Sequence, residues 1–86
     1  MKQHPHRPIA LDGLRTFQAV AQRLSFSGAA EQLHLTQSAV SRQIKALEVE
    51  VGLPLFNRGT RFVELTTAGA ALLQAAAPAL EQIDRT

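Results

Sequence analysis

The side chains with the greatest capacity for chemical recognition lie close together, between residues 36 and 45. Glutamine can pair with adenine through two hydrogen bonds, arginine and lysine can pair with guanine, and serine can bond to several base edges. Serine and threonine at a helix start, and nearby lysine, suit backbone phosphates. The stretch therefore predicts a DNA-contacting surface, with base contacts from Gln37, Ser38, Ser41 and Arg42, and backbone contacts from Thr36, Lys45 and the more distant Ser27.

A second basic feature follows at Arg58-Gly59-Thr60-Arg61, which we expect at the tip of a hairpin. A narrow minor groove carries a strong negative potential that attracts arginine. Arg58, Thr60 and Arg61 are therefore predicted to contact the minor groove. A solvent-exposed polar helix face and a solvated hairpin tip remain the alternatives for each feature alone. The occurrence of both features in this order favours a DNA-binding function.

The elements needed to hold these residues follow from the apolar spacing. A first helix is expected after Asp12, and Ser27 is expected to cap a short second helix over residues 28–33. Residues 34–36 form a turn, and Thr36 caps a third helix from Gln37 to Val51. Its buried stripe is predicted at Val40, Ile44, Leu47 and Val51, which leaves Ser38, Arg42, Lys45 and Val49 facing outward, with Ser41 at the edge.

The second half of the chain predicts a hairpin over residues 55–65, with a turn at 58–60, and a helix from Thr67 to Arg85 capped by Thr66. Pro78 predicts a kink or frayed final turns in that helix. The fold class is therefore mainly α, a winged helix-turn-helix with a long C-terminal helix. Three segments are expected: a flexible arm at 1–10, the DNA-binding domain at 11–65 and a linker or dimerisation helix at 66–86.

Composition restricts the other function classes. The chain of 86 residues has no cysteine, three histidines and a formal net charge of +2. His4 and His6 fall in the arm and His34 in a turn, so the residues predict neither an enzyme nor a metal site, and no cofactor is expected. No apolar run is long enough to span a bilayer, and we expect a soluble cytoplasmic protein without a membrane partner.

These residues also carry a family resemblance. Nearly the whole of residues 11–85 resembles the N-terminal domain of LysR-type transcriptional regulators, most closely the branch of glycine-cleavage activators and β-lactamase-gene regulators. The matching segments are LRTFQAVA at 14–21, LSF at 24–26, AAEQLH at 29–34, TQSAVSRQIKALE at 36–48, GLPLF at 52–56 and LTTAG at 65–69. The resemblance implies a winged helix-turn-helix that binds an interrupted inverted repeat in double-stranded promoter DNA.

The resemblance further implies a homodimer paired through the last helix, and a tetramer in the full-length protein. The apolar stripe of that helix predicts the dimer contacts Leu72, Ala76, Ala79, Leu80 and Ile83, with Ala68 and Leu72 partly folded back on their own domain. A C-terminal effector domain, which would bind a small-molecule inducer, is expected to be absent from this chain. The alternative function is a winged helix for protein–protein contact, which should lack basic residues on its third helix and wing.

Overall fold

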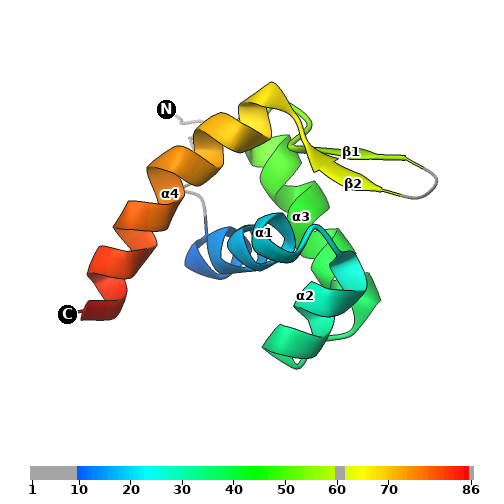
Figure 1. Cartoon of the computed structure of the whole chain (residues 1–86), viewed down its shortest axis with the longest axis horizontal. Coiled ribbons are helices and arrows are strands. Elements are labelled where there is room, and N and C mark those ends of the chain that lie inside the picture. The colour runs from blue at the N-terminus through cyan, green and yellow to red at the C-terminus, as the bar shows by residue number, and fades with distance from the viewer. Residues whose placement is uncertain (1–9, 60–61, 86) are drawn as a thin grey trace, which may run out of the picture.

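A computed structural model describes residues 10–59 and 62–85 of the chain. The elements follow in the order α1 (Leu11–Arg23), α2 (Phe26–Leu33), α3 (Gln37–Val51), β1 (Phe56–Arg58), β2 (Val63–Leu65) and α4 (Thr67–Arg85). Figure 1 shows the hairpin projecting from the first three helices on one side, while α4 extends away on the other. This arrangement confirms the predicted winged helix-turn-helix with a long C-terminal helix. The arm residues 1–9, together with Thr60 and Arg61, lie outside the described residues.

Local capping sets the ends of α3 as the sequence predicts. The Oγ1 atom of Thr36 accepts a hydrogen bond of 3.0 Å from the backbone N–H of Ala39. At the other end, Gly52 has a φ of 84°, a left-handed conformation that glycine adopts without steric cost and that commonly ends helices. The predicted span from Gln37 to Val51 is confirmed.

The starts of the first two helices differ from the prediction. The helix α1 begins at Leu11, so Asp12 lies inside the first turn, where its negative charge suits the helix dipole, instead of acting as the cap. In α2 the cap is Ser25, whose Oγ accepts a hydrogen bond of 2.9 Å from the N–H of Gly28. The assignment of the cap to Ser27 was wrong, because Ser25 stands three residues before an available N–H in the extended conformation that a cap requires.

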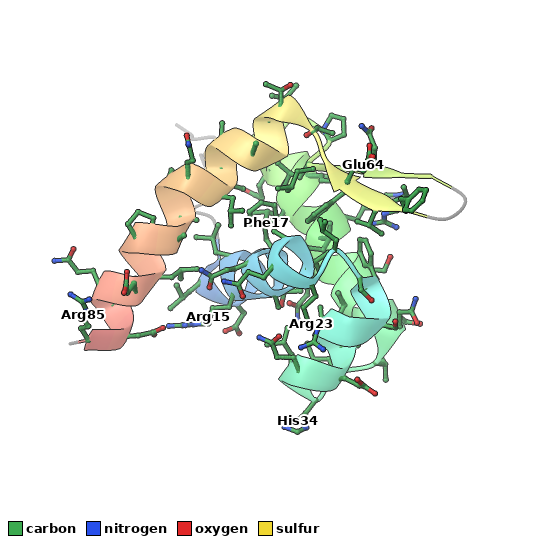
Figure 2. The ribbon with its side chains drawn as sticks, viewed as in Figure 1. Arg15, Phe17, Arg23, His34, Glu64 and Arg85 are labelled. Atoms are coloured by element: carbon green, nitrogen blue, oxygen red, sulfur yellow. The ribbon has the colours of Figure 1, made fainter. Side chains whose placement is uncertain are left out.

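The core gathers aromatic and aliphatic side chains from all three N-terminal helices and from the start of the hairpin. The Phe56 ring of β1 lies 5.4 Å from the ring centroid of Phe17 in α1 and 5.8 Å from that of Phe26 in α2. Such tilted and edge-on contacts add to the free energy gained by burial. The base of the hairpin is therefore packed into the helical core, with Phe17 at its centre (Figure 2).

Two further contacts fix where the hairpin leaves α3. The Oε2 atom of Glu48 accepts a hydrogen bond of 2.8 Å from the N–H of Leu55 and a longer one of 3.4 Å from that of Phe56. The strands pair antiparallel, with Asn57 opposite Glu64 and Arg58 opposite Val63. Arg58 thus belongs to β1, and its placement in the turn was wrong because strand pairing extends one residue further than expected.

The first turn of α4 is attached to the same segment. Thr66 caps the helix as predicted: its Oγ1 accepts a hydrogen bond from the N–H of Gly69 at 3.0 Å and donates one to the carbonyl of Pro54 at 2.7 Å. A Cβ atom at Gly69 would lie 2.1 Å from the carbonyl oxygen of Leu55. The absence of a side chain at Gly69 therefore allows α4 to pass this close to the backbone before β1.

Most of the apolar stripe of α4 packs against its own domain. Ala76 and Leu80 are 5% and 1% exposed. Leu72 is partly buried against the core cluster, as predicted. The assignment of Ala76 and Leu80 to a dimer surface is therefore corrected, because the domain itself covers them. Ala79 and Ile83 remain exposed.

The helix α4 continues through Pro78 to Arg85, so the expected fraying of its final turns is not observed. Two hydrogen bonds of 2.7 and 3.2 Å from Arg15 to the carboxylate of Asp84 join the end of α4 to α1 (Figure 2). These bonds lower the pKa of Asp84 from its ordinary value. None of the helices described here is long and apolar enough to cross a bilayer.

We predict that Gly69→Ala destabilises the fold, because its methyl group would overlap the carbonyl oxygen of Leu55. Overpacking of this kind costs about 1–3 kcal/mol in the free energy of unfolding. The matched control is Gly13→Ala, since nothing lies within 4 Å of a Cβ at that helical position. It should stabilise the protein by roughly 0.5 kcal/mol through helix propensity. Thermal unfolding of both variants tests this, and equal melting temperatures would contradict it.

Candidate nucleic-acid interface

The outward face of α3 has the composition that the sequence predicts. Val40, Ile44 and Leu47 are buried, whereas Ser38, Arg42, Lys45 and Val49 are exposed and Ser41 is half-buried between the two sets. The separation follows from the helical repeat of 100° per residue. Gln37, in the first turn, is exposed as well. The polar side chains in the N-terminal half of α3 therefore face outward.

A buried polar contact fixes the rotation of α3 about its axis. Thr16 of α1 is 3% exposed, and its hydroxyl is hydrogen-bonded to the side-chain oxygen of Gln43. A buried hydroxyl without a partner would be costly, so this bond restricts which face of α3 meets α1. The apolar spacing of the sequence did not predict this pair. The signal available was a threonine among the apolar residues of α1, opposite a glutamine at the edge of the α3 stripe.

The cations on α3 are not neutralised by the protein. The side chains of Arg42 and Lys45 make no hydrogen bond or ion pair within the described part of the chain. By contrast, Arg15 is paired with Asp84 at 2.7 Å and Arg85 with Glu81 at 3.3 Å, both near the far end of α4. Unpaired positive charge next to unpartnered amide and hydroxyl groups suits an anionic partner that also offers hydrogen-bonding groups.

The predicted phosphate-contacting residues lie at the starts of α2 and α3. Thr36 is exposed, and one lone pair of its hydroxyl is used by the cap of α3. Ser27 is exposed in the first turn of α2, with its Oγ 3.2 Å from the Oγ of Ser25. Helix starts present free N–H groups and a positive dipole end. Both residues therefore sit where an anion is favoured.

Arg58 is turned toward α2 and α3. Its Nη1 donates a hydrogen bond of 3.3 Å to the Oγ of Ser41, and its guanidinium carbon lies 4.2 Å from the centroid of the Phe26 ring. Phe26 was not among the residues predicted for the interface, although it stands in the Leu24-Ser25-Phe26 segment that carries part of the resemblance. Thr60 and Arg61, the other predicted wing contacts, lie outside the described residues.

A shallow hollow of about 320 Å³ separates the starts of α2 and α3 from the hairpin. The residues around it that can form hydrogen bonds come from all three elements: Ser25, Ser27, Gln37, Ser41 and Arg58. The structure thus brings together predicted residues from positions 27 to 58 of the chain. His34, in contrast, ends α2 in a left-handed conformation, is exposed, and lies at the far end of that helix (Figure 2).

No group of three or more histidine, cysteine, aspartate or glutamate side chains that could hold a metal ion occurs within residues 10–59 and 62–85. The geometry on these elements is that of a polar, positively charged surface formed by two helix starts and a hairpin.

Comparison with known proteins identifies the family. Residues 11–70 match the model of the family described as bacterial regulatory helix-turn-helix protein, lysR family. The regulator CbbR of Rhodospirillum rubrum is 53% identical over 68 residues, which cover 79% of this chain and 23% of that protein. The activator AmpR of Citrobacter freundii is 48% identical over 65 residues, covering 76% of this chain and 22% of AmpR. Because CbbR is at least as similar as AmpR, the predicted branch stays a prediction.

Among solved structures, the DNA-binding domain of BenM in complex with catB site 1 DNA superimposes with a TM-score of 0.85. It is 41% identical, and the match covers 88% of this chain and 84% of that one. The chain spans only about a quarter of the length of the curated relatives named above. Because the family model matches more than half of the chain and the fold agrees, the chain belongs to the LysR family of bacterial helix-turn-helix regulators.

Proposed function

We propose that this chain binds double-stranded DNA sequence-specifically, as the DNA-binding module of a LysR-type transcriptional regulator. The observation that carries the proposal is the outward face of α3, where Arg42 and Lys45 are exposed and unneutralised beside unpartnered polar groups. An α-helix fits the major groove, in which each base pair presents a distinct pattern of donors and acceptors. We assign base contacts to Gln37, Ser38, Ser41 and Arg42, and backbone contacts to Ser27, Thr36 and Lys45.

The hairpin is the wing of this module, and we propose that it lies over an adjacent minor groove. Arg61 and Thr60 are assigned to that groove on the sequence pattern alone. Arg58 precedes them in β1, within the same basic segment. A positively charged wing next to a groove-binding helix lengthens the contact along the duplex and adds phosphate or minor-groove contacts. The surface works by binding alone, so we propose no enzymatic activity and no cofactor.

We propose that the chain acts as a homodimer through α4 and binds an interrupted inverted repeat. A single small module makes few contacts, and two linked modules raise the effective affinity without new contacts. Support comes from Ala79 and Ile83, which stay exposed on α4 while Ala76 and Leu80 are covered by their own domain. A twofold dimer matches the symmetry of an inverted repeat.

The wider organisation is also a proposal. Residues 11–65 form the DNA-binding domain and 66–86 the linker helix. In the full-length regulator a small-molecule inducer would act through a C-terminal domain, and dimers would assemble into tetramers. Because its partner is promoter DNA, we place the protein in the bacterial cytoplasm.

Salt dependence tests DNA binding against the alternative of a protein-binding winged helix. We expect the affinity for duplex DNA to fall steeply as salt rises, because each neutralised phosphate releases condensed counterions. Each such contact contributes about 0.9 to the slope of log K against log salt. Fluorescence anisotropy with labelled duplexes measures the slope. A flat response would refute DNA binding, and equal affinity for every sequence would refute its specificity.

Gln37→Ala should relax sequence preference at one base position. The loss of a paired amide costs roughly 1–3 kcal/mol of discrimination there. The measurement compares affinities for the preferred duplex and for single-base variants of it. Gln22→Ala, an exposed glutamine on α1, is the matched control and should leave the preference unchanged. If Gln37→Ala weakens all duplexes equally, the assignment of Gln37 to a base edge is wrong.

Ile83→Glu should weaken dimerisation, since it would place a charge in the proposed contact of both copies. Full burial of isoleucine is worth roughly 1.5–3 kcal/mol, and because Ile83 is 49% exposed about half of that is gained in each copy, so its loss from both copies predicts at least a tenfold increase in the dimer dissociation constant. Sedimentation equilibrium measures the constant. Leu53→Glu is the control, because Leu53 and Ile83 are similarly exposed, at 54% and 49%, and Leu53 lies outside α4. Equal association of the two variants would contradict dimerisation through α4.

A further inference from the structure

Arg58 connects three elements at the edge of the proposed DNA surface. It ends β1, its guanidinium carbon lies 4.2 Å from the ring centroid of Phe26 in α2, and its Nη1 lies 3.3 Å from the Oγ of Ser41 in α3. Phe26 is itself held by the buried Phe56 ring at 5.8 Å. The guanidinium therefore rests on a fixed aromatic surface while one of its edges reaches α3, the proposed recognition helix.

The direction of the hydrogen bond between Arg58 and Ser41 follows from chemistry. A guanidinium carries five N–H donors and no acceptor, so the Oγ of Ser41 must accept. A serine hydroxyl has one proton to donate and two lone pairs. One lone pair is occupied by Arg58, which leaves the hydroxyl proton and one lone pair. In the described part of the chain, the Ser41 side chain makes no other hydrogen bond.

The bond from Arg58 also changes the strength of that donor. A positively charged donor polarises the hydroxyl it binds, and hydrogen bonds in such chains strengthen one another. The same polarisation makes the remaining lone pair of Ser41 a weaker acceptor for an amino group of a base. The arrangement therefore favours a partner that offers an acceptor atom.

We propose that Arg58 is a positioning residue that makes Ser41 a hydrogen-bond donor, so that Ser41 selects an acceptor atom on the duplex. The acceptor is an atom on a base edge, such as purine N7, guanine O6 or thymine O4, or else a phosphate oxygen, in which case the base contact proposed for Ser41 is replaced. The proposal rests on the proposed function, because Ser41 must face DNA for its proton to matter. It differs from a minor-groove role for Arg58, in which the guanidinium itself contacts the nucleic acid.

A double-mutant cycle between Arg58→Met and Ser41→Ala tests the proposal. Each single variant should weaken binding to the preferred duplex roughly three- to tenfold, the range of one net hydrogen bond. Because Arg58 acts through Ser41, the double variant should bind no more than twofold weaker than Ser41→Ala. Additive losses would overturn the proposal.

The salt slope provides a readout that a direct contact would change. Loss of a phosphate contact made by a cationic side chain lowers the slope by about 0.9, whereas a contact made by the neutral hydroxyl of Ser41 releases no counterion and its loss leaves the slope unchanged. Arg58→Met should therefore keep the slope of the unmodified chain. Arg85→Met is the charge-matched control, since Arg85 lies at the far end of α4 (Figure 2). A slope reduced by about 0.9 in Arg58→Met and not in the control would overturn the proposal.

Arg58→Lys covers the case in which the methionine variant unfolds. Lysine keeps the charge but lacks the planar guanidinium group. Only that group can stack on an aromatic ring with its face and donate a hydrogen bond from its edge at the same time. Arg58→Lys alone should weaken binding to the duplex. When it is combined with Ser41→Ala, the affinity should stay within twofold of that of Ser41→Ala alone. If lysine binds as well as arginine, a point charge is sufficient and the proposal fails.

Modified duplexes identify the acceptor. Methylphosphonate at single linkages removes phosphate charge, and single base-pair substitutions change the acceptor atoms on the base edges. One of these changes should lower the affinity of the unmodified chain for the duplex. The same change should not lower the affinity of the Ser41→Ala variant any further. Coupling to a methylphosphonate assigns a phosphate, coupling to a base-pair substitution assigns a base edge, and coupling to neither overturns the proposal. Failure of the parent chain to prefer any duplex would instead refute the proposed function.

Discussion

The packing of Phe56 against Phe17 and Phe26 is the contact on which the arrangement of the molecule depends. One strand residue joins the first helix, the second helix and the wing, with ring centroids 5.4 and 5.8 Å apart. A two-stranded hairpin is marginally stable alone, so the wing needs this attachment to hold a defined position. Phe26 in turn supports Arg58. The position of the wing relative to α1 and α2 is therefore set in the core.

The segment just before and at Phe56 also determines where α4 starts. Glu48 of α3 accepts hydrogen bonds from the N–H groups of Leu55 and Phe56, while the carbonyl of Leu55 accepts one from Thr66. Gly69 allows the close approach of α4 to that carbonyl. The recognition helix, the wing and the linker helix thus share one anchoring point. In a dimer, the separation of the two α3 helices depends on this junction as well as on the contact between the α4 helices.

The sequence predicted those features that local signals determine. Thr36, Gly52 and Thr66 mark helix ends through their own backbone preferences, and the helical repeat separates the buried and exposed faces of α3 without reference to the rest of the fold. Tertiary contacts decided the features that it did not predict. The burial of Leu80 depends on α1 packing beside α4, and the position of Arg58 depends on Phe26. Spacing along the chain carries neither piece of information.

Selection of binding sites from a pool of random duplex DNA tests the central claim most directly, because it presupposes no operator. The account predicts enrichment of an interrupted inverted repeat whose two halves are read by two copies of α3, with spacing set by the α4 contact. Enrichment of no sequence over the starting pool would contradict sequence-specific recognition. Enrichment of single, unpaired half-sites would contradict the dimer.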